Sequence, residues 1–192
     1  MLEHIERQLA SVTAQLRVAA LVVEQQDMLR SGAFELRAGG RLIAVLDMPE
    51  EVAVLPRAGA ADFDSAMCTR IHREDKRVPD NFARVGLAQL MWQYVLRTRH
   101  DVLPRRYRRA PIYFRRPPRV DGKLVDDRHL VVMRELALRP CTFDELRERA
   151  GLPDADLAQV LAALYFVGSV TSNPQRVGAG ASEPASAGAM AP

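Results

Sequence analysis

Four prolines fall between residues 102 and 121, and they limit the fold of this chain more than any other feature. They are Pro104, Pro111, Pro117 and Pro118. Proline lacks a backbone N–H and clashes with the preceding helical turn, so no continuous helix can cross this stretch. Residues 101–126 are therefore predicted to form an extended connector between two folded parts, with Ile112–Arg115 as a candidate edge strand.

The same stretch concentrates the positive charge. Nine arginines and a single acid, Asp101, lie between residues 97 and 119 and give a net charge of +8, whereas residues 1–96 carry −2 and residues 120–192 carry −3. Arginine binds phosphate or carboxylate through a planar fork of donors, and neighbouring aromatic rings can stack on bases or on guanidinium groups. The predicted anion-binding and partner-binding residues are Arg105, Arg106, Tyr107, Arg108, Arg109, Tyr113, Arg115, Arg116 and Arg119.

The nature of the anionic partner stays open at this stage. The composition suits an acidic protein surface, a nucleic acid or an anionic nucleotide. Equally, the arginines could pair with the acids of this same chain, which would leave the segment as a solvated connector.

Residues 1–100 are predicted to form an α+β domain that begins with a long helix over residues 2–30. Its apolar residues recur at alternating steps of three and four, namely Leu2, Ile5, Leu9, Val12, Leu16, Ala19 and Val23. This heptad spacing is typical of a dimerisation helix and predicts a homodimer through residues 2–23. The other interpretation is a helix that packs on the sheet of its own domain, and the additional apolar residues beside the seam favour it.

A three-stranded meander follows in the sequence. Alternating residues 33–38 and 41–47 flank Gly39-Gly40, which supplies the positive φ angles of a two-residue hairpin turn, and residues 52–55 predict a third strand. Phe63, Met67 and Ile71 recur every four residues and predict a short helix. Residues 81–99, with Asp80 as N-cap, predict the central buried helix of the domain.

Three helices are predicted over 128–138, 142–150 and 154–167, with Thr142 and Glu145 as a capping box and Gly151 in the turn. With these features, residues 127–173 resemble the winged helix-turn-helix superfamily. The resemblance implies a tri-helical module in which the third helix would read DNA and Gly168 would begin a wing. Residues 174–192 are rich in Gly, Ala, Ser and Pro and predict a disordered tail.

Two departures from the family pattern point away from DNA reading. The third helix contains neither lysine nor arginine, although a reading helix needs donors for bases and cations for phosphates. Its predicted exposed residues are Asp154, Ala155, Asp156, Gln159, Ala162 and Ala163. Residues 169–173 offer one short strand, and the tail supplies no partner for it. The module is therefore interpreted as a dimerisation or adaptor surface.

Sequence signatures of an enzyme are missing, and no catalytic, metal-binding or cofactor-binding residues are predicted. Cys68 and His72 are four residues apart, but two ligands do not complete a zinc site. The two cysteines, Cys68 and Cys141, are expected to be buried thiols in a reducing compartment, and the N-terminus lacks a leader pattern, so a cytoplasmic location is expected. The preference for arginine over lysine suggests a bacterial source. The sequence thus predicts a non-enzymatic regulatory or adaptor protein, with a nucleic-acid-binding regulator and a nucleotide-binding effector as the alternatives.

Overall fold

The computed structural model describes residues 2–29 and 31–177, and the chain divides into two compact units. The first unit comprises Met1–Val102 and Arg119–Asp121, and the second comprises Leu103–Pro118 and the residues from Gly122 onward. The fold class is α+β, as the sequence predicted. Most of the predicted connector is not a separate linker, because residues 103–118 cluster with the second unit.

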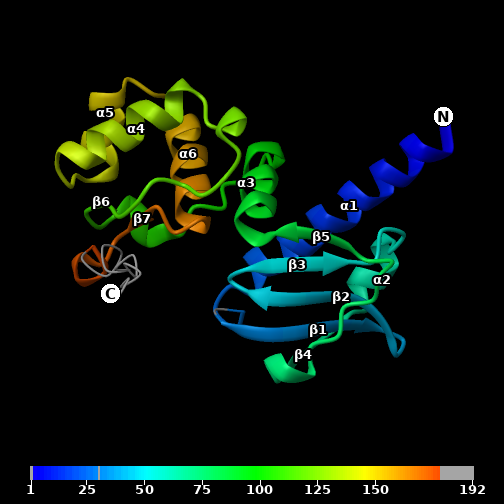
Figure 1. Ribbon diagram of the computed structural model, residues 1–192. Helices are drawn as coiled ribbons and strands as arrows, with labels where there is room; N and C mark the ends of the chain where they lie inside the picture. Colours follow the sequence, from blue (N-terminus) through cyan, green and yellow to red (C-terminus); the bar gives the residue numbers. More distant parts are fainter. Residues whose placement is uncertain (1, 30, 178–192) are drawn as a thin grey trace, which may run out of the picture. The chain divides into compact units, whose positions relative to one another are not determined.

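The first unit contains a five-stranded antiparallel sheet in the order β4-β1-β2-β3-β5 (Figure 1). The bounds are β1 Gly32–Ala38, β2 Arg41–Met48, β3 Glu51–Val54, β4 Met67–Ile71 and β5 Ala83–Gly86. Gly39 and Gly40 have φ angles of 55° and 81°, which confirms the predicted two-residue turn between β1 and β2. The predicted meander therefore forms the centre of the sheet, and two further strands extend its edges.

Both outer strands correct helices that the sequence predicted. Residues 67–71 form β4 beside β1, and helix α2 covers only Ala60–Asp64. Residues 83–86 pair with β3 as β5, so helix α3 begins at Leu87 after Gly86 and ends at Arg97, and Asp80 is not its N-cap. The physical reason is that exposed backbone at the edges of β1 and β3 gains ladder hydrogen bonds, which local periodicity does not register.

The core of the first unit occupies both faces of the sheet. Val45 and Ala53 pack with Phe82 on one face, where the loop before β5 covers them. Their neighbours Val52 and Val54 alternate with Ala53 and are buried on the opposite face, against which α1 and α3 lie (Figure 1). Because both faces are covered, the middle of β2 is apolar at consecutive positions and does not alternate.

Helix α1 spans Leu2–Glu24 and has two different halves. Ala14, Val18, Ala19 and Val22 are buried within the first unit. Towards the N-terminus, Ile5, Leu9 and Val12 keep 46%, 62% and 39% of their surface exposed. The helix therefore packs on its own unit through its second half, and homodimerisation through its first half stays a prediction.

The second unit is built from three helices, α4 Asp127–Leu138, α5 Phe143–Ala150 and α6 Asp154–Phe166. These bounds agree with the predicted helices within one residue. At the start of α5, the Thr142 backbone N–H donates to Glu145 Oε2 at 2.8 Å and the Glu145 N–H donates to Thr142 Oγ1 at 3.4 Å, which confirms the predicted capping box. Gly151 ends α5 with a φ of 64°, as the turn requires.

A small sheet completes the second unit. Strand β7, Val170–Thr171, pairs antiparallel with β6, Tyr113–Phe114, and Ile112 forms an antiparallel bridge with Cys141 on the other side. The candidate edge strand 112–115 is thus realised over Tyr113–Phe114 in a two-stranded sheet, and Ile112 adds an isolated bridge to Cys141. The sequence predicted no partner from the tail for the strand after α6, and the partner observed is β6, from the arginine-rich segment, which the sequence did not predict.

The remaining described segments include four short 3-10 helices, at Arg73–Asp75, Arg105–Arg108 (η2), Gly122–Leu124 and Pro174–Arg176. Most of the predicted disordered tail, residues 178–192, lies outside the described residues. None of the helices in residues 2–29 and 31–177 combines the length and the apolar content that a bilayer crossing requires.

Candidate arginine-rich binding surface

Arg106 is held by two tyrosines of the second unit. Its guanidinium carbon lies 5.4 Å from the ring centre of Tyr107 and 5.2 Å from that of Tyr165, and it donates a hydrogen bond to the Tyr165 hydroxyl at 3.0 Å. Cation–π contacts of this kind fix a guanidinium without neutralising it. Arg106 therefore ties η2 to the end of α6 and keeps its charge.

Arg108 contacts the N-termini of α5 and α6. Its guanidinium lies over the ring of Phe143 at 4.6 Å and donates to the two carboxylate oxygens of Asp154 at 3.1 and 3.3 Å. Phe143 is the first residue of α5 and Asp154 the first of α6, so one side chain joins η2 to two helix N-termini. Among the predicted binding arginines, Arg108 alone forms a salt bridge with a described carboxylate.

Arg115 is bound by backbone carbonyl groups. Its Nε donates to the carbonyl of Arg176 at 2.9 Å, Nη1 lies 3.5 Å from the carbonyl of Gly168, and its own N–H donates to Ser169. These bonds extend the β6–β7 ladder by one residue. Arg106, Arg108 and Arg115 are hereafter called the anchored arginines, because each holds the segment against its own unit.

The other three arginines of the segment within this unit have no such partner. Arg105 and Arg109 are exposed and Arg116 is half-buried. In the part of the chain that the structure describes, no carboxylate or carbonyl binds their guanidinium groups, and they are hereafter called the unpaired arginines. Arg105 and Arg109 flank the anchored pair on η2, so the anchored side chains fix the turn that presents the unpaired ones.

The predicted set is divided by the fold. Arg119 clusters with the first unit, whereas the remaining predicted residues cluster with the second. The second unit, through Val177, holds thirteen Lys and Arg residues against eight Asp and Glu residues, a net charge of +5. The positive charge thus belongs to one folded unit and not to a loose linker.

The two tyrosines of the segment also differ. Tyr107 is 2% exposed, its ring lies 5.2 Å from that of Tyr165, and its hydroxyl donates to the Val170 carbonyl at 3.3 Å. Burial raises the pKa of this phenol above its usual value. Tyr107 is therefore a core residue and offers no surface for stacking, whereas Tyr113 is half-buried on β6.

The third helix, α6, has little free surface. Ala162 and Ala163, which the sequence predicted to be exposed, are buried at 1% and 0% exposure. The acids at its N-terminus face arginines of the same unit, since Asp154 pairs with Arg108 and Asp156 lies 3.9 Å from Arg128. The helix is apolar on most of its circumference because it forms the core of the unit.

Sequence reasoning missed the residues that hold the arginines. Phe143, Asp154 and Tyr165 lie many residues from η2, and no local pattern connects them to it. The sequence offered one signal for Tyr165: it and Phe166 are the only aromatic residues of the predicted third helix and stand at its end.

No group of three His, Cys, Asp or Glu side chains among the described residues is placed to bind a metal ion. Cys68 and Cys141 are both free thiols, but only Cys141 is buried as predicted, because Cys68 is half-buried on the outer strand β4. Comparison of the chain with protein-family models, with curated proteins and with solved structures found no match.

Proposed function

We propose that this chain is a non-enzymatic regulatory or adaptor protein whose second unit docks an acidic partner protein through its arginine-rich segment. The observation that carries the proposal is the division of the segment into anchored and unpaired arginines. Three side chains hold the backbone, and the guanidinium groups of Arg105, Arg109 and Arg116 have no partner among residues 2–29 and 31–177. A preformed cationic surface lowers the ordering cost of binding and steers an anionic partner towards it.

The second part of the proposal is that the unit is winged-helix-like but does not read DNA. Three helices with a capping box, followed by a short strand, support that likeness, and β6 takes the place of a wing strand. A reading helix must offer an open face with donors. Helix α6 has neither basic residues nor exposed Ala162 and Ala163, which favours contact with a protein over base recognition.

A nucleic-acid-binding regulator is the alternative that the same arginines allow. Binding to single strands draws much of its strength from aromatic rings that stack on bases. Tyr107 is buried and Tyr113 is half-buried, which lowers the weight of this alternative.

Fluorescence anisotropy with two labelled probes tests the proposal, namely a poly-glutamate peptide and a generic DNA duplex. We expect the full chain to bind the peptide with micromolar affinity at low salt, and the R105A/R109A variant to bind it about tenfold more weakly. Both side chains are exposed, so the fold should survive the change. The control R17A/R57A removes two exposed arginines from the first unit and should leave binding unchanged.

Two outcomes would contradict the proposal. Equal affinity of the two double variants would show that only total charge matters. Duplex binding that is tighter than peptide binding, with a steep dependence on salt concentration, would instead favour the nucleic-acid alternative.

The two free cysteines favour a cytoplasmic setting, which we also propose. We further propose that the chain self-associates through the exposed stripe of Ile5, Leu9 and Val12 on α1. Light scattering should give the mass of a dimer for the full chain and that of a monomer for L9E. A monomeric full chain at micromolar concentration would exclude the dimer.

A further inference from the structure

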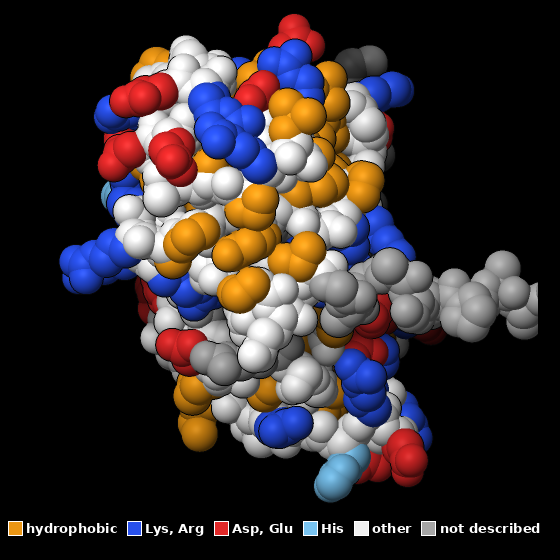
Figure 2. All heavy atoms as spheres, turned by 90° about the vertical axis from the view of Figure 1, so that its left-hand side faces the viewer, with side chains coloured by type: hydrophobic (Ala, Val, Ile, Leu, Met, Phe, Trp, Pro, Cys, Tyr) orange, Lys and Arg blue, Asp and Glu red, His pale blue; other side chains and the backbone are white. Residues whose placement is uncertain are grey.

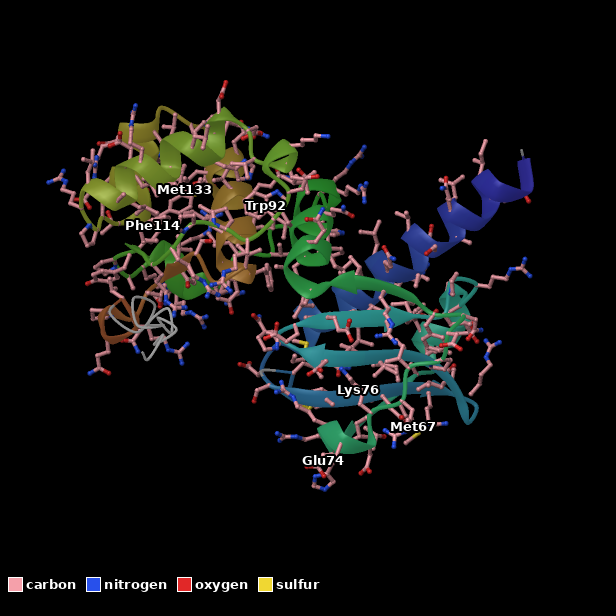
Figure 3. The ribbon with its side chains drawn as sticks, in the orientation of Figure 1. Met67, Glu74, Lys76, Trp92, Phe114 and Met133 are labelled. Atoms are coloured by element: carbon pink, nitrogen blue, oxygen red, sulfur yellow. The ribbon has the colours of Figure 1, made fainter. Side chains whose placement is uncertain are left out.

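A small cavity lies in the second unit, between β6 and the end of α4. Its volume is about 230 Å³, and its walls include Tyr113, Phe114, Leu136, Leu138, Arg139 and Val177. Sites for drug-sized ligands and cofactors usually measure about 300–1,000 Å³, so this cavity is sized for a smaller group, such as one large side chain. Strand β6 contacts helix α4. Figure 3 labels Phe114 on this strand and Met133 on this helix.

The rim of the cavity is apolar and open to solvent. Leu138 is 71% exposed and Val177 is 38% exposed. In Figure 2, hydrophobic side chains gather in the upper and middle parts of the face shown, with Lys and Arg as well as Asp and Glu side chains near them. A cluster of exposed apolar residues beside a cavity is typical of an interaction site, because binding of a partner would remove this apolar surface from water.

The one charged side chain in the wall of the cavity is a cation, and the nearest acid along the chain, Glu135, is already paired with Arg134 and Arg149. Arg139 forms part of its wall, is exposed, and has no salt bridge with a described carboxylate. Arg176 directly precedes the wall residue Val177, and its carbonyl holds the guanidinium of Arg115, which directly follows Phe114. No Asp or Glu contributes to the wall. The apolar cavity thus has one cation in its wall, Arg139, and a second, Arg176, next to a wall residue along the chain.

We propose that this cavity receives one large apolar side chain, of the size of Leu or Phe, from a short acidic segment of the partner protein. Carboxylates beside that side chain would pair with Arg139 and Arg176. The inference rests on the proposed function and adds to it a specific contact, because a buried apolar residue in a pocket supplies most of the energy of many interfaces. Charge alone would attract any acidic surface, whereas the cavity selects segments that carry an apolar residue.

Two labelled peptides and two matched leucine variants test the inference in the full chain. One peptide has Leu-Phe between pairs of Asp and Glu, and the other has Ser-Ser in their place. L138S changes the cavity rim, and L130S changes another exposed leucine of α4, which is 53% exposed and does not line the cavity. The variant A137W adds bulk at an exposed residue of the cavity wall and should block the cavity without disturbing the core.

We expect the Leu-Phe peptide to bind about tenfold more tightly than the Ser-Ser peptide. L138S and A137W should abolish this difference, and L130S should preserve it. Equal binding of both peptides to the full chain, sensitive to R105A/R109A, would overturn the inference and leave the proposed function intact. Failure of both peptides to bind at low salt would overturn the proposed function itself. If only a chain that ends at Val177 binds the Leu-Phe peptide, the C-terminal residues of the chain occupy the cavity, and the proposal of a separate partner is wrong.

Discussion

Replacing Arg108 by alanine should destabilise the second unit, whereas replacing Arg109 should not. Arg108 is 33% exposed and pairs with Asp154, which is 54% exposed, so the salt bridge itself contributes about 0.5 kcal/mol. The stack on Phe143, which is only 3% exposed, adds roughly 0.5–1 kcal/mol, and the covered side-chain stem adds a similar amount. The three contributions sum to about 1.5–2.5 kcal/mol, so the expected loss for R108A is at least about 1.5 kcal/mol, against at most about 0.5 kcal/mol for R109A.

Hydrogen–deuterium exchange followed by mass spectrometry locates this loss. A loss of about 1.4 kcal/mol corresponds to roughly tenfold faster exchange where opening is at equilibrium, so peptides from α5 and α6 should exchange about tenfold faster in R108A. Peptides from β2 in the first unit provide the internal control and should not change. R108K keeps the charge but loses the planar stack, and it should lie between the two.

A double-mutant cycle separates the salt bridge from the stack. The coupling between R108A and D154A should be about 0.5 kcal/mol, because the pair is partly exposed. If R108A and R109A change the exchange of α6 equally, Arg108 is not an anchor, and the division into anchored and unpaired arginines fails.

Two further predictions concern the helix caps of the second unit. Thr142→Ala should lower the stability by about 1 kcal/mol in a urea titration followed by circular dichroism, while Thr142→Ser, which keeps the hydroxyl, should cost less than half of this. Burial works to raise the pKa of Asp126, but hydrogen bonds from Arg128 and from the backbone and ring of His129 outweigh it and lower the pKa to about 2. A lowered carboxyl pKa stabilises the fold above the unfolded value of about 3.8, and this contribution is lost as the pH falls towards 2. After allowance for solvent screening, D126N should cost about 1 kcal/mol at neutral pH, and its difference from the unchanged chain should vanish near pH 2; a pH-independent difference would contradict the assignment.

Elements that depend on local chemistry could be predicted from the sequence. A two-residue hairpin turn of this type requires positive φ angles at two consecutive residues, and Gly39-Gly40 adopts them without strain. Thr142 and Glu145 satisfy each other's backbone N–H groups within a single turn, so their spacing alone fixes the start of α5.

The two outer strands could not be predicted in this way. Residues 67–71 form β4 only because β1 offers an open edge more than thirty residues earlier in the chain. Met67 is 72% exposed there, so no apolar alternation reveals the strand. Residues 83–86 continue directly into α3, and the apolar period of that helix hides the point at which pairing with β3 ends.

The candidate site divides in the same manner. Its location follows from composition, because nine arginines in one segment must lie somewhere on a folded surface. Which of them remain available depends on Phe143, Asp154 and Tyr165, which reach η2 only through the tertiary fold. The cavity beside Leu138 requires β6 to lie against the end of α4, and no sequence window contains both segments.

The acidic start of α6 acquires a different meaning from these contacts. In the sequence, Asp154 and Asp156 argue against DNA because they would repel phosphate. In the structure, both acids also face arginines of the same unit and lie at a helix N-terminus, where negative charge is favourable. They therefore stabilise the unit. Reversing them to arginine should not create a reading helix, because Ala162 and Ala163 would stay buried and Arg108 would lose its partner. The packing of α6, and not only its charge, therefore argues against base recognition.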